Sequence, residues 1–183
     1  GPVWAGTRYC GGTREQGSFT REGYQLLEIM AGLGMTLDIS HMREKAALTA
    51  LDLYDGPVVA THANSRRLLN SSAERHLTDT VIHRIHERNG VIGVVPFSKF
   101  LNENWTPTSA PDYVKISDLV AQIDNYCQLS GNSTQTGIGS DLDGGFGYLQ
   151  IPMEMNTIKD LQKIQPVLLE KGYTQEDVAH IIG

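Results

Sequence analysis

Three side chains that can bind metals or transfer protons follow apolar runs typical of buried strands. His41 ends the run MTLDISH, His62 ends PVVATH, and Asp141 ends QTGIGSD. In parallel α/β folds the carboxyl ends of the strands share one edge of the sheet, where functional sites are built. Imidazole suits zinc and neighbouring transition metals, and a carboxylate adds negative charge. We therefore predict a metal or catalytic site at which His41, His62 and Asp141 converge.

Other polar residues give weaker signals. His83 and His86 are three residues apart in a helical segment, but the charged residues around them favour a solvated helix face. The loop DLDGG lacks the further spaced oxygen ligands and the terminal Glu of an EF-hand, so we expect Asp143 to order the turn. Cys10 and Cys127 fit no metal spacing, are too few for a disulfide scaffold, and are expected to be buried thiols.

Three arginines follow His62 and could hold an anionic group of a substrate through bidentate contacts. A charged surface helix explains Arg66 and Arg67 at least as well. Arg75 lies in the connection before Thr78, closer to the expected mouth of the site.

The elements that must position these residues alternate between strands and helices. Strands are predicted at 3–9, 35–41, 57–62, 91–97 and 135–141. Helices are predicted after the capping Thr20 and at 42–53, 64–70, 79–89, 117–130, 157–171 and 174–182. This alternation predicts a parallel sheet. About five βα units fit either part of an eight-stranded barrel, which typically needs ~250 residues, or a small doubly wound sheet.

Composition narrows the possible partners without choosing an activity. The chain has 183 residues, is 40% hydrophobic and carries a formal charge of −6, which suits a single domain over 1–183. Nucleic acids and polybasic membrane contacts both need clustered positive charge, so we expect neither partner. No apolar stretch of about 20 residues and no leader pattern is visible, and we expect a cytoplasmic protein.

Several spaced motifs together resemble a known family. The run FTREGYQLLEIMAGLGMTLDISH is followed in order by PVVATHANSR, RHLTD, GVIGVVP and GIGSDLDGGFG. These motifs are similar to those of the membrane dipeptidase (renal dipeptidase) family of zinc peptidases, over roughly residues 4–182. The resemblance implies an α/β fold of the metal-dependent-hydrolase type, a (β/α)8 barrel. This chain would form about the last five βα units of that barrel.

The resemblance also implies roles for particular residues. The family uses two zinc ions (Zn2+) joined by a carboxylate and a water. His41 and His62 match the two histidines on the second zinc, and Asp141 matches the acidic residue that handles protons near the first. Arg75 matches the arginine that binds the carboxylate of a dipeptide substrate. Arg8 stands nearest to the family's oxyanion-stabilising histidine and replaces its titratable ring with a fixed cation.

The family's other metal ligands have no match in these residues. The first zinc is held by an HxD pair on the first strand, and a Glu on a later strand bridges both metals; the chain has no HxD. We therefore expect the carboxyl-terminal part of a dipeptidase-like protein, with a homo-oligomer or a complementing barrel half as partner. Two alternatives stay open: a related metal-dependent hydrolase of another amide or lactone, and a catalytically inactive truncated barrel.

Overall fold

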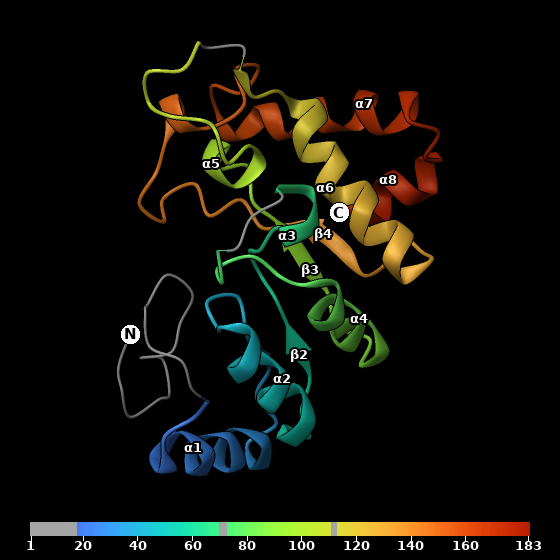
Figure 1. The fold of residues 1–183 in the computed structure, drawn as a ribbon. Coiled ribbons are helices and arrows are strands. Elements are labelled where there is room, and N and C mark those ends of the chain that lie inside the picture. The colour runs from blue at the N-terminus through green and yellow to red at the C-terminus, as the bar shows by residue number, and fades with distance from the viewer. Residues whose placement is uncertain (1–17, 70–72, 111–112) are drawn as a thin grey trace.

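The computed structural model describes residues 18–69, 73–110 and 113–183 (Figure 1). The predicted strand at 3–9, together with Arg8 and Cys10, lies outside the described residues. Cys127 is a buried free thiol, as the sequence predicts.

Among the described residues, four short strands run parallel and keep the order of the chain. They are β1 (Leu37–Asp38), β2 (Val58–Val59), β3 (Ile92–Val94) and β4 (Thr136–Ile138). Strand β1 pairs with β2 and β3 pairs with β4, and a parallel bridge between Ala60 and Ile92 joins the two pairs. The predicted parallel sheet is confirmed. The strands are shorter than the apolar runs, because residues at both ends of each run lie outside the paired segments.

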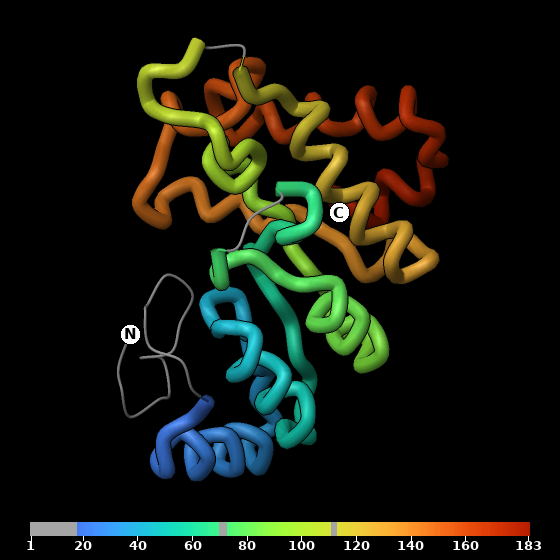
Figure 2. Tube along the Cα trace, in the orientation of Figure 1, coloured from blue at the N-terminus to red at the C-terminus, as the bar shows by residue number. Residues whose placement is uncertain are grey.

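Each strand is followed by a helix, and helices of successive units pack against one another in the order of the chain. The α-helices are α1 (Arg21–Gly32), α2 (Glu44–Leu53), α3 (Arg66–Leu69), α4 (Asp79–Glu87), α5 (Ser98–Leu101), α6 (Ile116–Ser130), α7 (Ile164–Glu170) and α8 (Gln175–Ile182), with 3-10 turns η4 (Tyr148–Gln150) and η5 (Ile158–Lys163). Helix α2 packs on α4, and α4 packs on α6. Figure 2 shows the chain advancing from the blue α1 to the red α7 and α8 at the opposite end. This advance is typical of successive βα units.

Local sequence signals set several helix boundaries. The Thr20 hydroxyl accepts from the backbone N–H of Gly23 at 3.1 Å, and the Thr78 hydroxyl accepts from Val81 at 3.4 Å. Both are the predicted N-caps. Gly131 ends α6 with φ 75°, a left-handed conformation that glycine adopts without strain. The single-turn helix α5 was not predicted, because four residues carry too little periodicity to reveal it.

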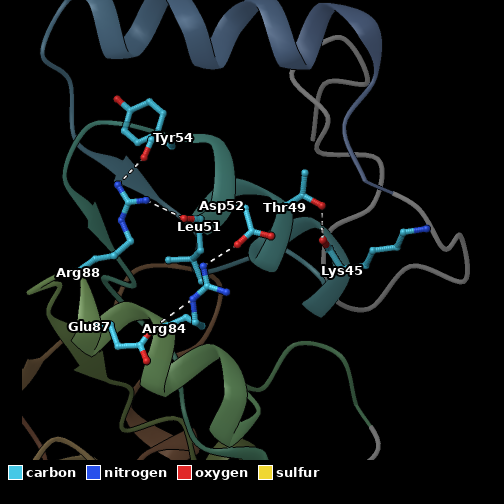
Figure 3. A network of polar contacts seen from close by, with 8 residues as sticks. All are labelled: Lys45, Thr49, Leu51, Asp52, Tyr54, Arg84, Glu87 and Arg88. Atoms are coloured by element: carbon cyan, nitrogen blue, oxygen red, sulfur yellow. Dashed lines mark hydrogen bonds and ion pairs between the residues drawn. The ribbon is translucent and has the colours of Figure 1, made fainter.

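A cluster of charged side chains joins helix α4 to α2 (Figure 3). Arg88 donates to the carbonyl oxygens of Leu51 at 2.7 Å, Gly56 at 2.8 Å, and Tyr54. Arg84 pairs with Asp52 at 2.6 Å. The hydrogen bonds from Arg88 satisfy carbonyl groups at and just after the end of α2, where no backbone N–H of the helix is available to them. Arg84 in α4 and Arg88 directly after it therefore connect two neighbouring βα units.

The two histidines of α4 differ in environment. His83 is exposed, as predicted, but His86 is 8% exposed, so the solvated face predicted for the pair is wrong for His86. His86 follows Ile82 by four residues and shares its buried face. Across the part of the chain that the structure describes, no helix is both long and apolar enough to cross a membrane.

Candidate metal centre

The turns that follow β1 and β2 bring His41 and His62 into contact. Leu37 lies opposite Val58 in the parallel ladder, and the same offset of 21 residues relates His41 to His62. Because the ladder is parallel, both rings emerge at one edge of the sheet. Their Nε2 atoms are 2.9 Å apart, and the ring centroids are 4.9 Å apart.

The histidine pair has the chemistry of two ligands for one metal ion. Two nitrogens bound to a tetrahedral zinc at about 2.0–2.1 Å lie about 3.3 Å apart, so the pair needs to open by only a few tenths of an ångström. Burial, followed by the positive charges of Arg75 and His62, lowers the pKa of His41 against the opposing effect of Asp141 and Asp38. The lowered pKa favours the neutral ring, which is the form that a metal ligand requires.

Asp141 follows β4 at the same edge of the sheet. Its backbone has φ 50°, a conformation uncommon outside glycine. Its carboxylate lies against Gly144, where an added Cβ would be 1.9 Å from Oδ1. Asp141 is close enough to raise the pKa of His41 electrostatically. Within residues 18–69, 73–110 and 113–183, however, no three His, Cys, Asp or Glu side chains form a group that could hold a metal.

Two glycines let the later strands approach the turn that carries His62. An added Cβ at Gly93 would lie 2.1 Å from the carbonyl oxygen of Thr61, and one at Gly139 would lie 1.8 Å from it. Gly139 stands two residues before Asp141. The absence of a side chain at these positions keeps the Asp141 segment close to the histidine turn.

Arg75 joins the two histidine turns through hydrogen bonds to the backbone of each. It is 8% exposed, and its two Nη atoms donate to the carbonyl oxygens of Ser40 and His62, each at 2.8 Å. Its guanidinium also lies 5.1 Å from the centroid of the Phe100 ring. The role in substrate binding that the resemblance implies stays a prediction. The structure adds a second role, which is to fix the backbone next to both metal-ligand candidates.

The other predicted cations fall into two groups. Arg66 lies 3.6 Å from Glu44, and Arg67 lies 3.2 Å from Asp79. These ion pairs agree with the charged surface helix that the sequence allowed. Arg8 lies outside the described residues, and its role stays a prediction.

Sequence reasoning missed the polar residues behind the histidines. The Asp38 carboxylate accepts from the backbone N–H groups of Ser40 and Thr61 and from both their hydroxyls. Burial of Asp38 would raise its pKa, but these hydrogen bonds together outweigh burial and lower it. An Asp inside an otherwise apolar strand run was the signal, because Asp is depleted from strands unless it has a specific partner.

Comparisons of sequence relate the chain to known proteins. A family model described as membrane dipeptidase, peptidase family M19, matches residues 4–183. An uncharacterised protein of Klebsiella pneumoniae, from the region 5′ of pqqA, is 30% identical over 156 residues, which are 85% of this chain and 54% of that protein. Dipeptidase TcpJ of Claviceps purpurea is 27% identical over 165 residues, 88% of this chain and 35% of that protein.

Solved structures share the same architecture. A metallopeptidase of Rhodobacter sphaeroides, bound to a phosphinate mimic of the dipeptide L-Ala-D-Ala, aligns with TM-score 0.77 and 26% identity over 91% of this chain and 44% of that one. The probable dipeptidase PvdM of Pseudomonas aeruginosa shares the fold, with TM-score 0.75, 22% identity, and 90% and 52% of the two chains covered.

The chain thus spans about half the length of most of these relatives, and its parallel βα units form part of a metallo-hydrolase barrel. The family match extends over both histidine turns and the Asp141 segment. The chain belongs to the membrane dipeptidase family, peptidase family M19.

Proposed function

We propose that the protein containing this chain is a zinc-dependent dipeptidase, and that the chain supplies the histidine pair of one metal. The observation that carries the proposal is the 2.9 Å contact between the Nε2 atoms of His41 and His62 at the carboxyl ends of neighbouring strands. Family membership supports a metal-dependent peptidase, and the dipeptide mimic bound by the Rhodobacter sphaeroides relative supports a dipeptide substrate.

The proposed chemistry assigns a separate task to each residue. When bound, the metal would supply an activated water and polarise the peptide carbonyl. His41 and His62 would hold it as neutral nitrogen ligands. Asp141 would accept a proton from the attacking water and deliver it to the leaving amine. Arg75 would hold the free carboxylate of the dipeptide, and Arg8 would steady the oxyanion.

The test is a substrate panel on the intact protein, including L-Ala-D-Ala, other dipeptides, a tripeptide, an N-acyl amide and a lactone. We expect dipeptides to be hydrolysed, the activity to disappear after chelation, and zinc to restore it. His62→Ala should abolish the restoration, whereas His83→Ala removes an exposed imidazole on α4 and should not. Hydrolysis that survives chelation, or hydrolysis of the lactone alone, would contradict the proposal.

A further inference from the structure

His62 has a hydrogen-bond partner on the ring nitrogen that faces away from His41. Its Nδ1 lies 2.8 Å from the hydroxyl oxygen of Thr61, while its Nε2 faces His41. The Thr61 hydroxyl is also 2.5 Å from Oδ2 of Asp38. Asp38, Thr61 and His62 therefore form a chain of hydrogen bonds that ends at a candidate metal-ligand atom.

The direction of each hydrogen bond follows from the chemistry of Asp38. An ionised carboxylate only accepts hydrogen bonds, so the single proton of the Thr61 hydroxyl must point at Asp38. The Thr61 oxygen then has only lone pairs to offer to His62. The contact between Thr61 and His62 is a hydrogen bond only if Nδ1 of the imidazole carries the proton.

Other donors hold the Asp38 carboxylate in place. Its Oδ1 atom accepts from the backbone N–H of Ser40 at 3.0 Å, the Ser40 hydroxyl at 2.6 Å, and the backbone N–H of Thr61 at 3.1 Å. The Ser40 hydroxyl oxygen in turn accepts from the backbone N–H of His62 at 3.1 Å. The carboxylate is thus fixed between the turns that follow β1 and β2.

We propose that Asp38 and Thr61 are positioning residues that set the tautomer of His62, with the proton on Nδ1 and the lone pair of Nε2 directed at the metal. This inference deepens the proposed function, because it rests on His62 being a metal ligand. Hydrogen bonding to the remote nitrogen of a ligating histidine fixes its orientation, and losing such a partner typically costs 10–100-fold in metal affinity.

The two histidines differ in this respect. Among the described residues the His41 ring has its hydrogen bond with His62, whose Nε2 lies 2.9 Å from Nε2 of His41, so in the metal-free protein the tautomer of His41 follows that of His62. We therefore assign to His62 the fixed ligand of the pair and to His41 the adaptable one. Removal of the Thr61 hydroxyl should act directly on His62, and on His41 only through the contact between the two Nε2 atoms.

The tautomer can be measured without any activity. Long-range 1H–15N correlation spectra of the metal-free intact protein, labelled with [15N]histidine, distinguish the two neutral forms of each ring. The His62 signals are assigned from their loss in His62→Gln. We expect the Nδ1–H form for His62 in the natural protein and in Thr61→Ser, which keeps the hydroxyl.

Two further variants separate this mechanism from a general structural effect. Thr61→Val keeps the shape but removes the acceptor, and we expect a mixture of tautomers and a 10–100-fold loss of zinc affinity by calorimetry. Asp38→Asn can turn its amide N–H toward Thr61, which redirects the hydroxyl proton to His62 Nδ1. We expect this nearly isosteric change to reverse the tautomer and to weaken zinc binding at least as much. Thr61→Ser should bind zinc within about threefold of the natural protein.

Each outcome is decisive for one of the two proposals. An Nε2–H form of His62 in the natural protein would overturn the inference. So would a Thr61→Val variant that keeps both its tautomer and its zinc affinity. A natural protein that shows the Nδ1–H form but binds no zinc would instead overturn the proposed function, while the hydrogen-bond relay itself would stand.

Discussion

Replacement of Arg75 by methionine should destabilise the protein much more than the loss of an ordinary surface charge. The guanidinium makes two hydrogen bonds of 2.8 Å, to the carbonyl oxygens of Ser40 and His62, and lies 5.1 Å from the centroid of the Phe100 ring. Methionine keeps the apolar stem of the side chain and removes the planar group that joins the two turns. Arg75→Met therefore removes these contacts and keeps the packing of the stem.

The expected magnitude follows from these contacts. Hydrogen bonds from a charged donor contribute about 1.5–3 kcal/mol each, and the contact with the ring adds about 0.5–2 kcal/mol. Removing a buried charge recovers part of its desolvation cost, so we expect a net loss of about 2–4 kcal/mol. For a protein of this size each kcal/mol shifts Tm by about 2–4 °C, which gives a decrease of about 5–15 °C.

Urea and thermal unfolding of the intact protein measure this loss directly. The control is Arg21→Met, because Arg21 is an exposed arginine in the first turn of α1. We expect the control to lose no more than about 1 kcal/mol. Equal losses in the two variants, or a loss below about 1 kcal/mol for Arg75→Met, would refute the role of Arg75 in joining the two turns.

Three further predictions follow from the same structure. Burial, followed by the charge of His83, lowers the pKa of His86 to about 4, so below pH 6.5 the unfolded chain gains a proton that the folded chain does not. This group should lower the free energy of unfolding by about 1–3 kcal/mol between pH 6.5 and 4. The pKa of His76 is lowered to about 4 as well, first by burial, so urea unfolding of His86→Leu should lose part of the pH dependence, whereas His83→Leu should keep nearly all of it. Gly139→Ala places a Cβ 1.8 Å from the Thr61 carbonyl oxygen and should lower zinc affinity more than tenfold by calorimetry, whereas Gly137→Ala meets only ordinary contact at 3.8 Å and should not. Asp141→Asn keeps the shape of the side chain but cannot accept a proton, so steady-state assays should show kcat lowered roughly 10²–10⁴-fold with a smaller change in KM.

The histidine pair could be predicted because each histidine directly follows an apolar run that is typical of a buried parallel strand. Two apolar runs of similar length each end in a histidine, and a parallel ladder with matched runs places those ends together. The helix starts at Thr20 and Thr78 could also be predicted, because a hydroxyl N-cap depends only on residues a few positions away in the chain.

The chain of hydrogen bonds from Asp38 through Thr61 to His62 could not be predicted in the same way. The bond between Asp38 and Thr61 joins residues 23 positions apart, and its geometry depends on the register of two strands. The buried position of Arg75 likewise depends on carbonyl groups supplied by two separate turns. The error at His86 has a different cause: its charged neighbours were given more weight than its spacing of four from Ile82.

The most direct test of the proposed metal centre is an anomalous difference map at the zinc edge, from crystals of the intact protein grown with zinc. We expect a peak between the Nε2 atoms of His41 and His62, within bonding distance of about 2.0–2.1 Å from each nitrogen. Zinc at full occupancy elsewhere in the protein, with no peak between these two rings, would contradict the assignment.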